Sequence, residues 1–233
     1  MKMSPPPLPW LIAAFVIGAV LAMATKLQLA QDRRAVPAPQ IVISSQVERA
    51  THDAAYARLD AEARLRAALA AYAVGEELLS DNFLADAEMP IASLPASLLS
   101  DDDRARLNQL VYQARMAIVA QSGVAAKIEA AIDDLRQTPL HEPGLPRTRS
   151  AMAGAIADQI EKAINGFVET LSSRDYQTYL MGYGHYQTAQ ALYGTHRDDI
   201  KIYSQTADKL IENSLLQLTD FYPSPRLADA DIP

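Results

Sequence analysis

The chain has 233 residues, a net charge of −7 and no cysteine, and only 6% of its residues are aromatic although 49% are hydrophobic. The absence of cysteine excludes disulfides, thiolate metal sites, cysteine nucleophiles and a lipoprotein acyl anchor. The acidic balance argues against nucleic acid as a partner, because no basic stripe is present to neutralise phosphates. Since alanine dominates the hydrophobic residues, we expect closely spaced helices.

The first distinctive segment is apolar. Residues 3–25 carry no charged side chain, and no second stretch of this kind follows. As a helix, residues 8–30 would be roughly 34 Å long, enough to cross a hydrocarbon core of about 30 Å. Trp10 would lie at the interface, and Lys26 could extend its ammonium group there. We predict a tail over residues 1–7, then a transmembrane anchor that binds the lipid bilayer.

A cleaved signal peptide is the alternative for this segment. Lys2 supplies a basic start, and Ala22-Met23-Ala24 matches a small-residue cleavage site. Either interpretation sends the chain to the export machinery. We favour the retained anchor because the apolar run is longer than that of a typical signal peptide, and so expect a single-pass protein of the bacterial inner membrane with its bulk domain in the periplasm. Arg33 and Arg34 favour the opposite orientation, since basic residues tend to stay in the cytoplasm.

A proline-containing linker is expected over residues 31–45, followed by a helical bundle over residues 46–222. Its first helix should begin at Ser44 or Ser45 and run to about Leu79. Four of its charged residues are interpreted as a solvated surface: Asp60, Glu62, Arg64 and Arg66. Residues 80–100 should break the helix because they contain two prolines, Pro90 and Pro95.

A second long helix is predicted over residues 103–137. Asp101, Asp102 and Asp103 would stabilise its positive end. Apolar residues repeat along it with heptad spacing, which indicates a coiled-coil-like seam; they are Leu107, Val111, Ala114, Ile118, Ala125, Ile128, Ile132 and Leu135. Gln121 would be a polar residue on the seam that sets its register. The second helix should pack against the first as an antiparallel hairpin about 50 Å long.

The remaining elements follow a connector over residues 138–149, which contains three prolines. A third helix should start near Ser150, and a last helix should run from Asp198 to about Thr219. Residues 223–233 are expected to form a flexible tail. The predicted fold is all-α: one N-terminal transmembrane helix followed by an elongated antiparallel helical bundle with coiled-coil-like packing.

Between the third and last helices, tyrosines recur at helical spacing. We call them, with His185, the tyrosine face; its tyrosines are Tyr176, Tyr179, Tyr183, Tyr186 and Tyr193. They could form a packing seam, since tyrosine buries its ring and leaves its hydroxyl at the rim. They could instead bind a protein partner, because tyrosine is enriched in interface hot spots, or stack on a small aromatic or sugar ligand. Gly182 and Gly184 would then allow close backbone approach.

No pattern of catalytic or metal-ligating residues is present. The chain lacks the usual zinc-protease, serine-hydrolase, dinucleotide, phosphate-loop and calcium-loop motifs. We therefore predict no enzyme activity, no cofactor and no metal site. The sequence favours a membrane-anchored helical scaffold or interaction protein of the bacterial cell envelope, with a protein partner or a homo-oligomer. The alternative is an extracytoplasmic module that binds a small ligand, or assists a sensor, through the tyrosine face.

Overall fold

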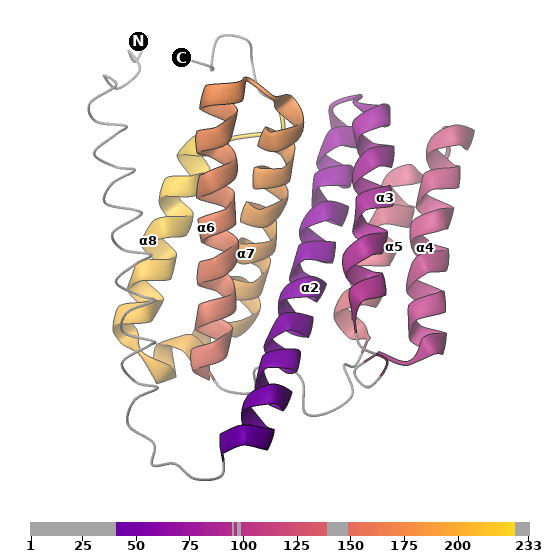
Figure 1. The fold of residues 1–233 in the computed structure, drawn as a ribbon. Helices are drawn as coiled ribbons and strands as arrows, with labels where there is room; N and C mark the ends of the chain where they lie inside the picture. The colour runs from indigo at the N-terminus through magenta and orange to yellow at the C-terminus, as the bar shows by residue number, and fades with distance from the viewer. Residues whose placement is uncertain (1–40, 95, 97–98, 139–148, 227–233) are drawn as a thin grey trace, which may run out of the picture.

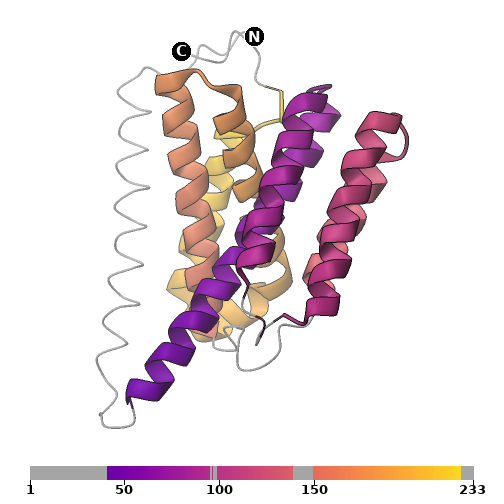
Figure 2. The same cartoon turned by 45° about the vertical axis from the view of Figure 1, so that its right-hand side comes forward.

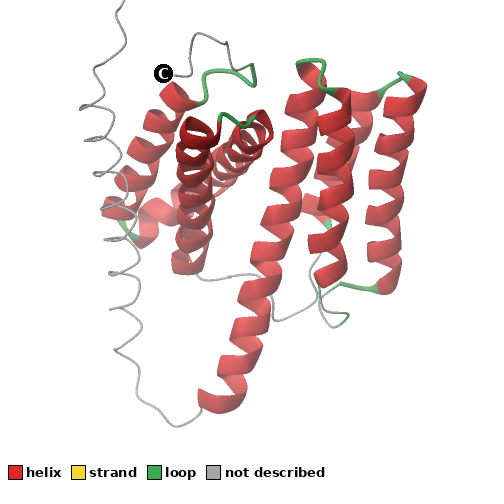
Figure 3. Cartoon of the chain, turned by 45° about the horizontal axis from the view of Figure 1, so that its top comes forward, coloured by secondary structure: helices red, strands yellow, loops and turns green. Residues whose placement is uncertain are grey.

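The structure is a computed structural model that describes residues 41–94, 96, 99–138 and 149–226, and this part of the chain is helical without strands (Figure 1 and Figure 3). With the labels of Figure 1, its helices are α2 (Ile41–Ala73), α3 (Glu77–Ser93), α4 (Asp101–Ala120), α5 (Val124–Gln137), α6 (Arg149–Ser173), α7 (Tyr176–Tyr203) and α8 (Gln205–Phe221). The predicted all-α class is confirmed for these residues.

Helix α2 is shared by two groups of helices (Figure 1). On one side, α2, α3, α4 and α5 form a ring in which each helix packs against the next and α5 returns to α2. On the other side, α6, α7 and α8 pack against one another, and α7 joins them to α2. Figure 2 shows α3 and α2 crossing in front of this second group. The predicted helical bundle is thus confirmed, but its main elements are not one long hairpin.

The first predicted helix differs at both ends. It begins at Ile41, within the predicted linker, and ends at Ala73 instead of Leu79. Gly75 causes the break, because its φ of +90° lies in the left-handed region that glycine adopts without strain. A further helix, α3, then occupies much of residues 80–100, and Pro90 lies inside it. Pro90 cannot donate a hydrogen bond to the Asp86 carbonyl, and α3 ends three residues later, at Ser93.

The second predicted helix is in fact the pair α4 and α5, which pack against each other. Gln121 and Gly123 adopt left-handed conformations with φ of 49° and 65°, which reverses the chain between them. Gln121 is therefore an exposed cap of α4, and its predicted place on a seam is wrong. Most residues of the predicted seam are nevertheless buried, since both helices direct them into the ring; Ala125 is half-buried.

The start of α4 follows the expected capping. The Ser100 hydroxyl accepts a hydrogen bond from the Asp103 amide at 3.1 Å, and the Asp103 carboxylate accepts one from that hydroxyl at 2.6 Å. Asp101 and Asp102 lie in the same first turn. The predicted stabilisation of the positive helix end by these acids is consistent with this geometry.

The last helices are displaced relative to the prediction. Helix α6 starts at Arg149, beside the expected Ser150. Helix α7 runs through Asp198 to Tyr203, so Asp198 does not cap the last helix. Ser204 has that role, because its hydroxyl accepts a hydrogen bond from the Ala207 amide at 3.2 Å.

The predicted membrane anchor over residues 8–30 lies outside the described residues, as do residues 139–148 of the connector and 227–233 of the tail. Among the helices that the structure describes, none is long and apolar enough to cross a membrane.

Candidate functional site

The tyrosine face of α7 is largely buried. Tyr179 is 0% exposed, and Tyr186 and Tyr193 are also buried, whereas Tyr176 and Tyr183 are half-buried. The rings of Tyr179, Tyr183 and Tyr186 all lie within 6.1 Å, centre to centre, of the ring of Tyr222, which follows α8. This face is therefore part of the hydrophobic core between α6, α7 and α8.

The hydroxyl groups of Tyr176, Tyr179 and Tyr222 donate hydrogen bonds to backbone carbonyls. Tyr176 donates a hydrogen bond to the Pro225 carbonyl at 2.6 Å, and Tyr179 donates one to the Ser224 carbonyl at 2.7 Å. Tyr222 donates one to the Ala163 carbonyl of α6 at 2.7 Å. Residues 222–226 are thereby held against α7. The beginning of the predicted flexible tail is thus tied to the tyrosine face.

Tyr183 and Tyr193 differ from these tyrosines. Burial raises the pKa of the half-buried Tyr183, whose ring packs edge-on against Tyr186. The Tyr193 hydroxyl donates a hydrogen bond to the buried Asp208 carboxylate of α8 at 2.6 Å. Burial and this carboxylate raise the pKa of Tyr193. All five tyrosines thus pack in or against the core, and the hydroxyl groups of Tyr176, Tyr179, Tyr186 and Tyr193 are hydrogen-bonded there. Binding of a partner or ligand by this face stays a prediction.

His185 lies on a different side of α7, among charged residues of α2 and α6. Its Nδ1 atom is 2.8 Å from the Gln159 amide oxygen. Burial lowers the pKa of His185 to about 3; Asp60 opposes this shift, while Lys162 and Arg64 add to it. The ring is therefore neutral near pH 7. In the described part of the chain, no group of three or more histidine and acidic residues could hold a metal ion.

A buried carboxylate joins α2 to α5. Glu62 is 2% exposed, and its Oε1 atom lies 2.9 Å from Arg66 Nε and 2.6 Å from Arg136 Nη2. Arg58 donates a hydrogen bond to the Arg136 carbonyl in the last turn of α5. The predicted solvated surface is wrong for Glu62, because the partner that covers it is 74 residues away. Charge complementarity here favours the docking of α5 on α2.

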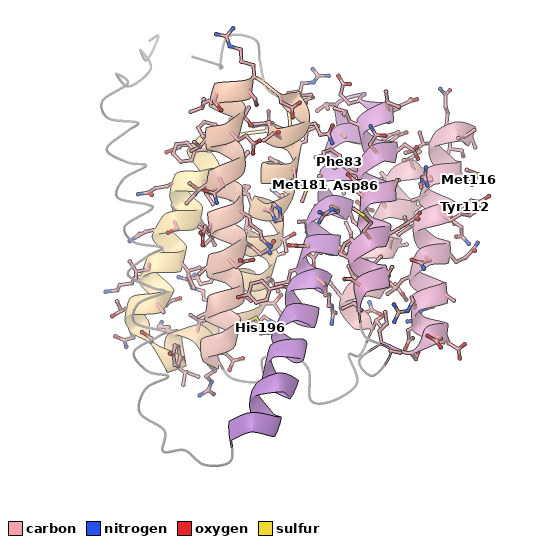
Figure 4. The ribbon with its side chains drawn as sticks, in the orientation of Figure 1. Phe83, Asp86, Tyr112, Met116, Met181 and His196 are labelled. Atoms are coloured by element: carbon pink, nitrogen blue, oxygen red, sulfur yellow. The ribbon has the colours of Figure 1, made fainter. Side chains whose placement is uncertain are left out.

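The outer sides of α3 and α4 present exposed or half-buried side chains without charge. We call them the outer α3–α4 face: Leu78, Asn82, Ala85, Met89 and Ala92 on α3, with Ala105, Gln109, Tyr112, Met116 and Val119 on α4. Leu78 is 74% exposed, Tyr112 52% and Val119 77%. Figure 4 shows Tyr112 and Met116 on the outer side of α4. Large apolar side chains gathered in this way mark interaction surfaces more often than scattered ones do.

Ion pairs between α3 and α4 fix the direction of this face. Arg115 Nε lies 2.7 Å from Asp81 Oδ1, and Arg115 Nη1 lies 3.6 Å from Glu88 Oε1. These residues mark the sides on which the two helices face each other. At about 100° per residue, each uncharged row lies roughly a quarter turn away from the ion pairs and opposite the buried residues of its helix. Since α3 and α4 are antiparallel neighbours, the two rows point to the same side.

No protein-family model matches the chain, and comparison with curated proteins and with solved structures gives no match. Its function therefore has to be inferred from its own residues. In the described part these include a tyrosine face that is mostly buried and a two-helix surface with two uncharged rows.

The sequence analysis missed the outer α3–α4 face, although a signal for half of it was present. On α4, the exposed row from Ala105 to Val119 has alternating spacings of four and three, parallel to the buried row from Leu107 to Ile118. Two such rows on one helix predict two packing surfaces. The row on α3 was out of reach, because the prolines concealed that helix.

Proposed function

We propose that the chain is a membrane-anchored helical interaction protein of the bacterial cell envelope, without catalytic activity, that binds protein through the outer α3–α4 face. The observation that carries this proposal is the exposed, uncharged, heptad-spaced surface of α3 and α4. Interfaces are enriched in large apolar or aromatic side chains, such as Tyr112 and Met116, and depleted of charge, as the two rows are.

The location belongs to the same proposal. The apolar segment over residues 8–30 would hold the chain in the inner membrane, and the proline-containing linker would separate the helical domain from the bilayer. The domain would then lie in the periplasm, where its partner would be another envelope protein or a second copy. Resistance of the protein to carbonate extraction, together with its digestion by protease added to spheroplasts, tests this location. A protease-resistant domain in intact spheroplasts contradicts the periplasmic placement.

Site-specific photo-crosslinking in cells tests the interaction. A photoreactive phenylalanine replaces Tyr112 in one variant and Ile202 in a matched control, since Ile202 is 66% exposed on α7, away from this face. We expect a discrete cross-linked species from position 112 that disappears when Met116→Lys is added, and none from position 202. Equal cross-linking at both positions, or none at position 112, contradicts the proposed function.

A further inference from the structure

On the basis of the function proposed above, we infer that the outer α3–α4 face binds the same face of a second copy of this chain around a two-fold axis. A two-fold interface brings identical surfaces together, so the surface has to be compatible with itself. The uncharged rows meet this condition, because no like charges within them would be apposed.

The size of the face fits a reversible dimer. The rows from Leu78 to Ala92 and from Ala105 to Val119 are each about 21 Å long at 1.5 Å per residue, and two neighbouring helices are about 20 Å wide. The projected area is therefore roughly 400 Å², and side chains standing out from the helices enlarge the accessible area. Weak specific interfaces bury up to about 600 Å² per partner. Anchoring both copies in one membrane would raise their effective concentration and favour such pairing.

The helix directions are compatible with a two-fold interface. Glu76 and Glu77 lie at the start of α3, and Asp101 and Asp102 at the start of the antiparallel α4, so the acids occupy opposite ends of the face. An axis parallel to the helices lays α3 of each copy antiparallel to α4 of the other, and an axis perpendicular to them lays each helix antiparallel to its own copy. In both cases each acidic helix start lies opposite a helix C-terminal end of the other copy, and the dipoles of facing helices are antiparallel.

The ion pairs between the rows are compatible with this arrangement. Arg115 is already bound to Asp81 and Glu88 of its own copy. Its side chain is 32% exposed and those two are 36% and 45% exposed, so all three lie at the groove between α3 and α4. Covering these paired but partly exposed charges would cost desolvation energy, which fits a weak and reversible dimer.

Sedimentation velocity of the full chain in mild detergent, over a concentration series, measures the pairing. We expect a concentration-dependent dimer that Met116→Lys abolishes and that the control Ile202→Lys leaves intact, with the helical circular-dichroism signal unchanged in both variants. A chain that stays monomeric at its highest soluble concentration overturns the inference. A dimer that persists with Met116→Lys also overturns it, since such a dimer is formed by another surface.

Disulfide trapping tests whether the two faces are apposed, and the absence of natural cysteine gives it no background. Asp81 and Arg115 are level with each other, so Leu78 is level with Val119. Differently tagged Leu78→Cys and Val119→Cys chains, mixed and oxidised, should form a heterodisulfide if the axis is parallel to the helices. Leu78→Cys mixed with Ala92→Cys should form one if the axis is perpendicular to them. A chain in which neither pair forms a heterodisulfide overturns the inference.

The same reagents distinguish this inference from the proposed function. If the chain is monomeric but position 112 cross-links in cells to a different protein, the second copy is wrong and the interaction function stands. Binding of the domain to neutral phosphatidylcholine vesicles through Tyr112, without a dimer, contradicts both, because the face would then be a lipid surface.

Discussion

The phenol of Tyr222 lies directly against the bare backbone of Gly182, in the space that a side chain at position 182 would need. The same region of α7 approaches α6 so closely that a Cβ added at Gly166 would lie 2.9 Å from the Gly182 Cα atom. Two turns of helix thus meet without side chains between them, and the Tyr222 hydroxyl reaches the Ala163 carbonyl at 2.7 Å. The glycines of the tyrosine face serve packing between helices.

Gly182→Ala should therefore destabilise the protein, by about 1–3 kcal/mol or more, because the methyl group would displace Tyr222 and separate α6 from α7. Gly194→Ala is the matched control on the same helix, since nothing lies within 4 Å of a Cβ added there. It should raise stability by up to about 1 kcal/mol through helix propensity. Urea denaturation of the two variants measures both effects. Equal shifts in the same direction would mean that α7 is not packed this closely.

The Glu62 carboxylate leads to a second prediction. Glu62→Gln keeps the shape of the side chain but leaves Arg66 and Arg136 without their buried counter-charge. The two arginines that remain are partly exposed, so the loss should be about 1–3 kcal/mol, and the thermal midpoint should fall by several degrees. Glu129→Gln, at an exposed position of α5, is the control and should leave the midpoint nearly unchanged. A loss no larger than that of the control would show that Glu62 is solvated.

The seam residues, the break at Gly123 and the burial of Glu62 show what the sequence could and could not predict. Heptad spacing predicted correctly that Leu107, Ile128 and their neighbours are buried, because periodicity depends only on local residues. It did not predict the break at Gly123, since glycine is tolerated inside helices and only the packing of α5 on α4 favours the left-handed turn. The burial of Glu62 depends on Arg136, which no local pattern places nearby.

The tyrosine face shows the same limit at the candidate site. Its spacing placed the tyrosines on one side of a helix correctly, and Gly182 and Gly184 suggested close approach of some backbone or ligand. Which group approaches depends on α2, α6 and the segment after α8. Because Tyr222 and the Ser224 carbonyl come from that segment, their contacts with α7 follow from tertiary packing alone.

His185 should make stability sensitive to acid. Burial lowers the pKa of His185 to about 3, whereas the unfolded chain binds the same proton near the ordinary value of 6.5. The contribution of the neutral ring is therefore complete above pH 6.5 and is lost as the pH falls toward 3. In that window the free energy of unfolding should decrease by up to about 1.4 kcal/mol per pH unit from this group.

Urea midpoints of the wild type and of His185→Gln between pH 7 and pH 4 measure this effect. The variant should lose stability less steeply as the pH falls, even if its stability at pH 7 is lower. His196→Gln, on the same helix but half-exposed, is the control for removing a histidine. Parallel pH profiles for the wild type and His185→Gln would contradict a buried neutral ring.

The last prediction concerns the segment after α8. Tyr176 and Tyr179 hold the carbonyls of Pro225 and Ser224, so removing both hydroxyls should release the chain around Arg226. A double Tyr176→Phe, Tyr179→Phe variant should lose about 1–3 kcal/mol locally, because each hydrogen bond contributes about 0.5–1.5 kcal/mol. Trypsin cleaves after arginine and needs an extended, accessible chain, so cleavage after Arg226 should become several-fold faster. Intact-mass analysis over time measures the rate of this cleavage. Tyr112→Phe, on the outer α3–α4 face, should leave the cleavage rate unchanged. If the double variant is cut no faster than wild type, the two hydroxyls do not restrain this segment, and binding by the tyrosine face becomes the better account of why they are there.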